Sequence, residues 1–372
     1  MHNVLVTGAA GFIGRNLVTA LQRRYDVAIT AISRADSWDA LASALLQADV
    51  VYHLAGVNRP QAEEEFALGN ADFTRQIVEH LERHHRRPTI VIPSSIQAAL
   101  DNPYGRSKKA AEEVLCDYAG RSGAAIAIYR LPNVFGKWSR PNYNTVVATF
   151  CHNIARNLDI VISDPNRELE LVYIDDVVAA FLRHLDEPPD PARQRYSVTR
   201  IFRVSLGELA ARIRRLHAIR ASLVVPDLAD DLTRCLHATY LSFLPEGEFA
   251  YPVRLNSDDR GWLFELIKSE HFGQVFISKT LPGVTRGDHY HDTKLEKFCV
   301  VQGEAVIRFR HVHSDAIIEY PVSGSDIRVV DIPPGYTHSI ENTGKEEMIC
   351  LFWANRIFAP DAPDTYWEKV KK

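Results

Sequence analysis

The first half of the chain alternates short apolar runs with segments whose apolar residues recur at helical spacing. Runs such as "NVLVTG", "VAITAIS", "VVYHLAG" and "TIVIPSS" are rich in Val and Ile, and the intervening segments, such as "FTRQIVEHLERHH", have amphipathic helical patterns. Apolar strands separated by amphipathic helices predict a parallel sheet with right-handed crossovers. "AIAIYRLPNVFG" and "ELELVYIDDVVAAFLRHL" are expected to add later strands to the same unit.

The pattern changes after about residue 245. Strand-like segments such as "GQVFISKT", "KFCVVQGEAVIRFRHV" and "DIRVVDI" follow one another, with Gly and Pro turns and almost no helical period. Closely spaced strands of this kind predict a small antiparallel barrel or double-sheet roll. We therefore expect two domains, residues 1–243 and residues 244–372, and a fold class that joins a doubly wound α/β sheet to an all-β domain.

Composition and charge narrow the class of protein. The chain of 372 residues has a net charge of −4 with basic and acidic residues interspersed, which argues against nucleic-acid and membrane partners. Five dispersed cysteines without a CxxC pair predict reduced thiols rather than a disulfide framework. Neither a signal peptide nor an apolar run long enough to span a bilayer is apparent, so we expect a cytoplasmic protein.

A glycine-rich turn follows the first expected strand. Residues 7–14 read T-G-A-A-G-F-I-G, between a strand and a helix. Gly8 permits the tight turn, Gly11 lets the backbone approach a pyrophosphate, and Gly14 lets helix and strand pack closely. This context predicts a dinucleotide-binding site at the helix N-terminus.

The end of the second expected strand indicates which dinucleotide is bound. Ser33 is followed by Arg34, where an acidic residue would accept the ribose hydroxyls of NADH. An arginine pairs instead with a 2′-phosphate, so NADPH is favoured over NADH.

Tyr104 and Lys108 form a YxxxK pair in "DNPYGRSKKAAEEVL". Pro103 is placed as a first helical residue with Asn102 or Asp101 as cap, so the Tyr and Lys side chains should lie one turn apart on one helix face. Lys108 would then lower the pKa of the Tyr104 phenol and hold the nicotinamide ribose. Tyr104 would act as a general acid that protonates a carbonyl oxygen as hydride arrives.

Ser94 and Ser95 end the preceding expected strand, where a hydroxyl could polarise the same carbonyl. The glycine turn, "DVVYHLAG", the serine strand, YxxxK, "RLPNVFG" and "VYIDDVV" together resemble the extended short-chain dehydrogenase/reductase family over residues 1–240. The resemblance implies that Ser95 is the better candidate for the catalytic hydroxyl, with Ser94 second, and that Asn133 contacts the diphosphate of a nucleotide sugar.

The same resemblance implies a set of cofactor contacts. These are Gly8, Gly11, Phe12, Ile13, Gly14, Ser33, Arg34, Leu54, Ala55 and Lys108. The chain departs from most nucleotide-sugar members of the family in the short segment between Ser95 and Tyr104. That departure favours simple reduction over epimerase or dehydratase chemistry in this domain.

The C-terminal half carries residues at metal-ligand spacing. His289 and His291 alternate along one expected strand, Glu296 would complete three ligands from one hairpin, and His338 in "PPGYTHSIEN" would add a fourth from a partner strand. Three histidines and one carboxylate suit a divalent metal with open positions, with zinc favoured and nickel, manganese or iron also accepted by such ligands. The spacing resembles the cupin family, which implies a small β-barrel with the ligands inside.

The two-part layout, the short "SSIQAALDNPYGRSK" and the segments "TRGDHYHDTKLEKFCVVQGEAVIRFR" and "LFWANRIF" resemble the CapF-type family of bifunctional capsular-polysaccharide enzymes. This resemblance implies a UDP-2-acetamido-2,6-dideoxy-hexos-4-ulose substrate. The cupin domain would epimerise C3, and the reductase domain would reduce the C4 ketone with NADPH to a UDP-2-acetamido-2,6-dideoxy-L-talose type product. A homodimer is expected, because cupins and short-chain reductases both commonly associate.

Two other functions are left open by the sequence. The cupin could be a structural dimerisation module on a C4 reductase, or the whole chain could be an NADPH-sensing binding protein, against which the intact Ser/Tyr/Lys set argues. The base that removes the C3 proton is not assigned. Lys297 and Tyr290 adjoin the ligands, but strand alternation would point both away from the metal.

Overall fold

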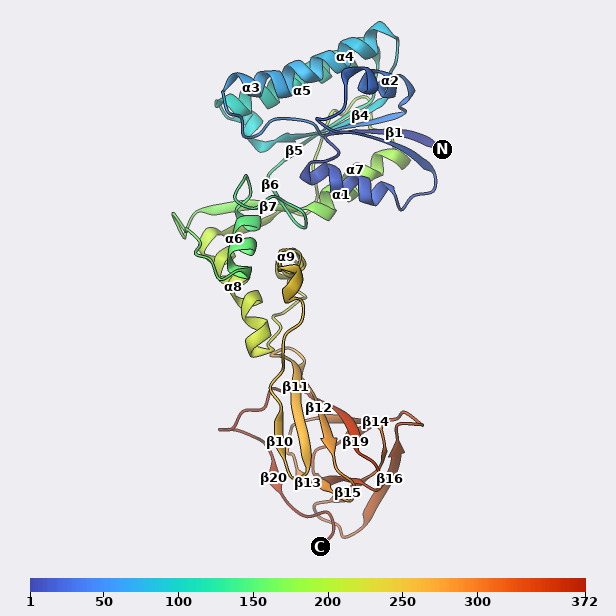
Figure 1. The fold of residues 1–372 in the computed structure, drawn as a ribbon, viewed down its shortest axis with the longest axis vertical. Helices are drawn as coiled ribbons and strands as arrows, with labels where there is room; N and C mark the ends of the chain where they lie inside the picture. Colours follow the sequence, from blue (N-terminus) through green and yellow to red (C-terminus); the bar gives the residue numbers. More distant parts are fainter. The chain divides into compact units, whose positions relative to one another are not determined.

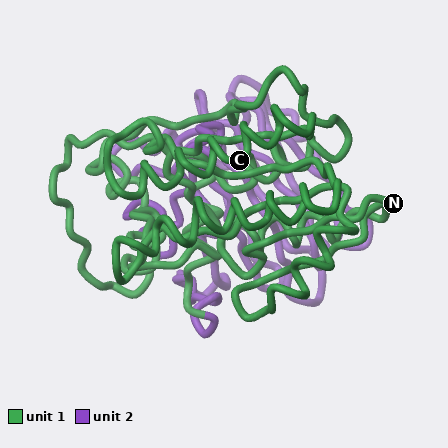
Figure 2. The backbone as a smooth tube through the Cα atoms, turned by 90° about the horizontal axis from the view of Figure 1, so that it is seen from above, with its two compact units in different colours: residues 1–213, 235–245 green, residues 214–234, 246–372 purple.

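A computed structural model describes all 372 residues, which form two compact units (Figure 1). One unit comprises residues 1–213 and 235–245, and the other comprises residues 214–234 and 246–372 (Figure 2). The second unit thus includes a segment that precedes the expected domain boundary at residue 243, and that boundary stays a prediction. None of the helices combines the length and the apolar composition needed to cross a bilayer.

The first unit is built on a six-stranded sheet of order β2-β1-β3-β4-β5-β8, in which all neighbouring strands run parallel. The strands are β1 (His2–Thr7), β2 (Val27–Ile32), β3 (Val50–His53), β4 (Thr89–Ser95), β5 (Ile126–Leu131) and β8 (Arg195–Tyr196). The strand order reverses direction at β1, because β2 lies on one side of it and β3 on the other. Doubly wound sheets bind ligands at such a switch point, beyond the carboxyl ends of the strands.

Helices cover both faces of this sheet (Figure 1). They are α1 (Phe12–Leu21), α2 (Trp38–Gln47), α3 (Glu64–Phe66), α4 (Phe73–Arg83), α5 (Pro103–Ser122) and α7 (Ile174–Asp186). Leu5 of β1 joins a buried cluster with Leu81 of α4 and Leu115 of α5. Its neighbour Val6 joins another cluster with Leu17 of α1 and Phe181 of α7. Successive strand residues point to opposite faces, so β1 is apolar on both sides, as a parallel strand between two helical layers must be.

A smaller sheet of order β6-β7-β9 completes the strands of this unit. Its strands are β6 (Asn133–Phe135), β7 (Glu168–Tyr173) and β9 (Phe202–Ser205). The remaining helical elements are α6 (Val146–Ala155), α8 (Leu206–Ser222), α9 (Asp231–Leu241), the π-helical turn η1 (Ala67–Asp72) and the 3₁₀ turns η2 (Ile96–Ala99) and η3 (Glu246–Glu248). Residues of α8 and α9 are divided between the two compact units.

The second unit contains two sheets, of order β10-β11-β12-β19-β14-β17 and β16-β15-β18-β13-β20. The strands are β10 (Asn256–Asp258), β11 (Gly261–Ser269), β12 (Gly273–Thr280), β13 (Thr285–Tyr290), β14 (Glu296–Gln302), β15 (Glu304–His311), β16 (Ile317–Ser323), β17 (Val329–Ile332), β18 (Tyr336–Asn342), β19 (Met348–Ala354) and β20 (Tyr366–Trp367). Their pairings are antiparallel, and a buried cluster including Phe298, Ile307 and Ile340 draws on both sheets. The predicted fold class, a doubly wound parallel sheet followed by a cupin-type β-structure, is confirmed.

Candidate functional site

The glycine turn predicted to bind a dinucleotide joins β1 to α1 at the switch point of the sheet. Gly8 has φ of +66°, and a Cβ there would lie 2.6 Å from the backbone nitrogen of Ala55. A Cβ on Gly14 would lie 2.2 Å from the carbonyl oxygen of Gly8. Both positions therefore require glycine, and the segment of Leu54 and Ala55 that follows β3 lies directly beside the turn.

The N-terminus of α1 completes this cradle. Gly11 is the N-cap residue, and no side chain caps the helix. The first N–H groups of a helix, here those of Phe12 and Ile13, lack intrahelical partners and carry the positive end of the helix dipole. The close backbone approach and the uncapped helix end fit the pyrophosphate of a dinucleotide.

Arg34 lies just beyond the end of β2 and is exposed. The neighbouring Ser33 donates two hydrogen bonds of 2.8 Å to the Asp36 carboxylate, one from its backbone nitrogen and one from its hydroxyl. The Arg34 guanidinium forms no ion pair or side-chain hydrogen bond, so it is free to pair with a phosphate. The preference for NADPH stays a prediction.

Helix α5 begins as the sequence predicts and carries the YxxxK pair. Pro103 is its first residue, and Oδ1 of Asn102 accepts a hydrogen bond of 2.8 Å from the backbone nitrogen of Gly105. Of the two caps considered, the structure therefore selects Asn102 over Asp101. The cap fixes where the helix starts, and with it the turn that presents Tyr104.

Burial controls the protonation of Tyr104 and Lys108. It raises the pKa of Tyr104 above its ordinary value, although a hydrogen bond with Ser95 opposes the shift. Burial also lowers the pKa of Lys108 to about 8, and Nζ of Lys108 donates to the carbonyl oxygen of Pro93 at 2.9 Å. Burial drives both groups toward their neutral forms. The expectation that Lys108 lowers the pKa of Tyr104 stays a prediction.

The two candidate serines have different surroundings. The hydroxyl of Ser95 interacts with Tyr104, whereas the hydroxyl of Ser94 donates to Glu112. Glu112 is 1% exposed and is also paired with Arg130 at 2.6 Å. These surroundings favour Ser95 over Ser94 as the catalytic hydroxyl, and that role stays a prediction. Sequence reasoning missed Glu112, although its position one helical turn after Lys108 was an available signal.

Two asparagines of the first unit bear on the predicted contacts, Asn133 from the sequence and Asn70 from the structure. Asn133, at the start of β6, is exposed, and its Nδ2 donates to the carbonyl oxygen of Glu170 at 3.3 Å. Its contact with a substrate stays a prediction. Asn70 was not singled out in the sequence. It lies in the π-helical turn, accepts from the backbone nitrogen of Val57 at 3.1 Å and donates to Ser107 at 3.0 Å, so it ties the loop after β3 to α5.

The four predicted metal ligands come together in the second unit. His289 of β13 is paired with His338 of β18, His291 follows β13, and Glu296 begins β14. Their ligand atoms all lie within 4.8 Å of one another. Donors on opposite sides of a metal with bonds of about 2.1 Å are about 4.2 Å apart, so the cluster has the size of a coordination shell.

The expectation that Glu296 shares a hairpin with the two histidines is wrong. Strand β13 pairs with β18 and β20, whereas β14 pairs with β17 and β19 in the other sheet. Glu296 therefore reaches the cluster from the facing sheet. The chain crosses between the sheets in the few residues that separate His291 from Glu296.

Hydrogen bonds fix the tautomers of two ligand histidines. Nδ1 of His291 donates to the carbonyl oxygen of Asp364 at 2.6 Å, and Nδ1 of His338 to that of Tyr336 at 3.3 Å. A carbonyl only accepts, so in the neutral rings each Nε2 carries a lone pair. Both Nε2 atoms are buried without a hydrogen-bond partner, and they lie 3.3 and 3.5 Å from Oε2 of Glu296. Three converging electron-pair donors with no proton between them fit a divalent cation.

The charges in the cluster agree with that fit. Burial, assisted by the two neighbouring imidazoles, lowers the pKa of His289 to about 4, so the ring is neutral. Burial opposes the ionisation of Glu296, but the Lys294 ammonium group beside Oε1 favours the carboxylate and helps to hold its pKa below the ordinary value. Neutral histidines and an ionised carboxylate are the states that a metal requires.

Lys294 was not singled out in the sequence. It is buried, and its Nζ lies 2.7 Å from Oε1 of Glu296, on the carboxylate oxygen that faces away from the histidines. It lies in the loop before β14, so no pattern in the sequence could have found it.

A loop from the C-terminal end of the chain holds this region in place. The Asp364 carboxylate accepts from the backbone nitrogens of Asp292 at 2.9 Å, Thr293 at 3.0 Å and Lys294 at 2.8 Å. It thereby fixes the crossing between His291 and Glu296. Nothing in the sequence pointed to Asp364, because the backbone groups that it holds lie at least 70 residues away.

A cavity of about 500 Å³ opens beside the ligands. His289, Lys294 and Glu296 line it together with aromatic side chains. The rings of Phe276 and Phe352 stack with centroids 4.8 Å apart. The volume suits a sugar-sized ligand, and the apolar wall strengthens electrostatic contacts at the ligands by excluding water.

Comparisons with known proteins agree with this two-part layout. Residues 4–199 match the NAD dependent epimerase/dehydratase family, and residues 256–366 match the polysaccharide biosynthesis C-terminal domain. UDP-2-acetamido-2,6-beta-L-arabino-hexul-4-ose reductase of Pseudomonas aeruginosa is 44% identical over 98% of this chain and 97% of that protein. The spore coat polysaccharide biosynthesis protein SpsL of Bacillus subtilis is 28% identical over 29% of this chain and 79% of that protein.

Solved structures extend the likeness to the whole fold. The capsular polysaccharide assembling protein CapF of Staphylococcus aureus superposes with a TM-score of 0.93 at 46% identity, covering 99% of this chain and 100% of that one. The chain belongs to the NAD dependent epimerase/dehydratase family and, over its full length, to the CapF-type proteins that join such a domain to a cupin.

Proposed function

We propose that this protein is a nucleotide-sugar reductase of polysaccharide biosynthesis that also epimerises its substrate. The proposed substrate is a UDP-2-acetamido-2,6-dideoxy-hexos-4-ulose, and the product is a UDP-2-acetamido-2,6-dideoxy-L-talose type sugar for a capsular polysaccharide or O-antigen. The reductase activity named for the Pseudomonas relative supports the reduction of a UDP-4-keto sugar. The Ser95–Tyr104 contact beside the glycine turn supplies the chemistry for it.

Reduction at C4 uses the first unit. Bound NADPH supplies the hydride. Tyr104 gives its phenolic proton to the C4 oxygen, and Ser95 holds that oxygen by a hydrogen bond. The raised pKa of Tyr104 keeps the phenol protonated at neutral pH, as a general acid must be. The Nζ of Lys108, oriented by its hydrogen bond to the Pro93 carbonyl oxygen, would hold the nicotinamide ribose.

Epimerisation at C3 uses the second unit and precedes reduction. The C3 proton is acidic only while C4 is a ketone, because the electron pair left on C3 is then delocalised onto the C4 oxygen. A bound divalent metal, zinc in the first place, supplies Lewis acidity at that oxygen. His289, His291, Glu296 and His338 would hold the metal and leave positions open for the ketone. Once C4 is reduced the proton is no longer acidic, so reduction traps the epimer.

The base that moves the C3 proton stays unassigned. Lys297 is exposed, and its Nζ pairs with Asp331 on the outside of the sheet, as strand alternation predicts. The ligand cluster opening on a sugar-sized cavity is the single observation that carries the epimerase half of the proposal.

The configuration of the product tests this function. Wild-type enzyme, NADPH and the UDP-4-keto sugar should give a product inverted at C3, identified by proton NMR coupling constants. His289→Ala should give a C4-reduced product with the original C3 configuration. An unchanged epimer composition in His289→Ala would favour the alternative function, a C4 reductase with a structural cupin. The homodimer and the cytoplasmic location stay predictions.

A further inference from the structure

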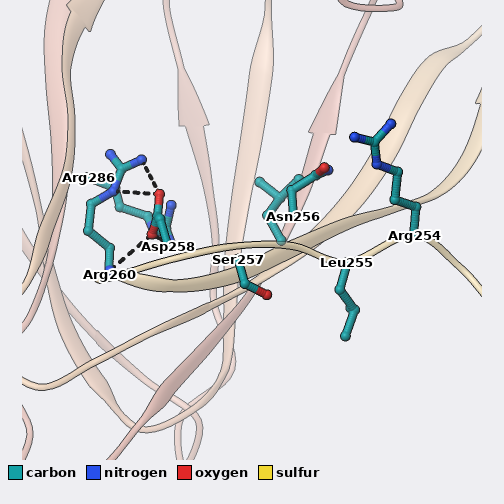
Figure 3. A pocket seen from close by; sticks show the side chains of 8 residues that line it. Arg254, Leu255, Asn256, Ser257, Asp258, Arg260 and Arg286 are labelled. Carbon is teal, nitrogen blue, oxygen red and sulfur yellow. Dashed lines mark hydrogen bonds and ion pairs between the residues drawn. The ribbon is translucent and has the colours of Figure 1, made fainter.

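A second hollow adjoins the cavity of the metal cluster. It measures about 470 Å³ and is lined by Arg254, Arg260 and Arg286, and we call it the arginine pocket. Asn256, Leu263 and two of these arginines, Arg260 and Arg286, line both spaces, so the two are neighbours. Figure 3 shows two guanidinium groups gathered at one end of the pocket and that of Arg254 extending separately from the neighbouring segment.

The arginine pocket has more positive than negative charge. Asp258 is its one carboxylate, and it is engaged by Arg260 at 2.6 Å (Figure 3). The same carboxylate makes only a long ion pair of 3.9 Å with Arg286. Arg254 is exposed and has no ion-pair partner. The pocket thus contains three guanidinium groups and one carboxylate, which is already paired with Arg260.

Arg286 is the most deeply buried of the three arginines. Its side chain is only 16% exposed, and its hydrogen bonds go to neutral groups, Oγ1 of Thr280 at 3.0 Å and the carbonyl oxygen of Lys279 at 3.3 Å. Burial and the neighbouring Arg260 lower the pKa of Arg286. A mostly buried guanidinium without a close counter-charge gains from an anion, and its fork geometry suits phosphate oxygens.

Strand register places Arg286 on the same face as a metal ligand. Arg286 is paired with Ile340 and His289 with His338, while a bulge between Gly287 and His289 takes up the extra residue. Ile340 and His338 are two residues apart on β18, so they share a face and lie about 7 Å apart along the strand. Arg286 and His289 therefore line the same cavity from one strand.

We propose that the arginine pocket binds the diphosphate of the nucleotide sugar while the C4 carbonyl of the sugar lies at the metal cluster. In a sugar nucleotide the diphosphate is on C1, across the ring from C4, which matches the placing of Arg286 relative to His289. This inference rests on the proposed function. It gives the second unit its own nucleotide-sugar site, so each chain binds two UDP groups, one in each unit.

Calorimetric titration of the metal-loaded, full-length protein with UDP tests the pocket directly. The expected result is two UDP per wild-type chain. Arg286→Gln should weaken one of the two sites by about 10- to 100-fold, the usual loss when a charge-assisted contact is removed. Arg260→Gln should weaken the same site, and it serves as the second variant because Arg260 is half exposed and not needed for packing. Arg328→Gln, at an exposed arginine paired with Asp326, is the matched control and should leave both sites unchanged.

Uridine and NADP⁺ distinguish what the pocket recognises. Uridine lacks phosphate and should show no binding that depends on Arg286. Competition by NADP⁺ for the Arg286-dependent site would make it a dinucleotide pyrophosphate site and overturn the proposal. A stoichiometry of one UDP per wild-type chain would also overturn the proposal, as would two sites whose UDP affinities are unchanged in both arginine variants. The epimerase function is tested separately, by exchange of the C3 proton. Its failure would not change the UDP stoichiometry.

Discussion

Asp364 holds His291 from a loop 73 residues further along the chain, with its carbonyl oxygen 2.6 Å from Nδ1 of the imidazole. That bond leaves the lone pair of Nε2 pointing at the ligand cluster. The Asp364 carboxylate meanwhile fixes the backbone that crosses from one sheet to the other. One residue thus sets both the tautomer of a ligand and the path of the chain to the next one.

Removing the Asp364 carboxylate should loosen the metal site. We expect Asp364→Ala to lower metal affinity by roughly 10- to 100-fold, the usual cost of losing a partner that orients ligands. The measurement is competition with a chromogenic chelator. Asp361→Ala, at an exposed carboxylate in the same loop, should retain wild-type affinity. Equal affinities in the two variants would show that the loop does not organise the ligands.

Replacing the two serines should have separable effects. Ser95→Ala removes the hydroxyl beside Tyr104 and should lower kcat for ketone reduction by about 10- to 100-fold, if it acts as one hydrogen bond to the developing charge. Ser94→Ala removes a donor to buried Glu112 and should mainly cost stability, about 1–3 kcal/mol. Steady-state NADPH oxidation and urea unfolding measure the two effects. A larger loss of kcat in Ser94→Ala would reverse the assignment.

Tyr104→Phe should separate the two reactions. Without the phenolic proton, NADPH-dependent reduction should fall by about 10²- to 10⁴-fold. Exchange of the C3 proton should persist, because its proposed site contains no residue of the first unit. Absorbance at 340 nm follows the first reaction and proton NMR the second. Loss of both in this variant would contradict the division of labour.

Lys108 should make stability depend on pH in a definite window. Its folded-state pKa of about 8 lies below the ordinary 10.5, so between these values the unfolded state binds more protons and stability rises with pH. Relative to Lys108→Met, the wild type should gain up to about 3 kcal/mol between pH 7 and pH 10.5. Urea unfolding followed at 222 nm reports it, since the helices lie mainly in the first unit.

Lys109→Met is the matched control for this experiment. Lys109 follows Lys108 on α5, and its side chain is 60% exposed. Its replacement should leave the pH dependence of the wild type unchanged. If the free energies of unfolding of Lys108→Met and wild type changed equally with pH across the window, Lys108 would have the same pKa in the folded and unfolded states.

The sequence predicted the parts of this molecule that depend on local patterns. Gly8, Asn102 and Tyr104 follow from spacing within one turn and one helix, and the structure places them as expected. His289 and His338 follow from strand alternation and two short motifs. These features need no knowledge of the tertiary fold.

Features that depend on distant segments could not be read from the sequence. Ligand spacing does not tell which sheet a strand joins, so Glu296 was expected in a hairpin that does not form. The effect of burial on the pKa of Tyr104 could not be foreseen, because burial is a property of the packed structure. Asp364 and Arg286 acquire their roles only through partners brought close by folding.

Proton exchange at C3 tests the central claim most directly. The UDP-4-keto sugar is incubated with metal-loaded enzyme in deuterated water without NADPH, and the C3 signal is followed by proton NMR. We expect an enzyme-dependent loss of this signal that is abolished in His289→Ala and after metal removal by a chelator. Exchange no faster than in the enzyme-free control would contradict the account and leave a C4 reductase that carries a structural cupin.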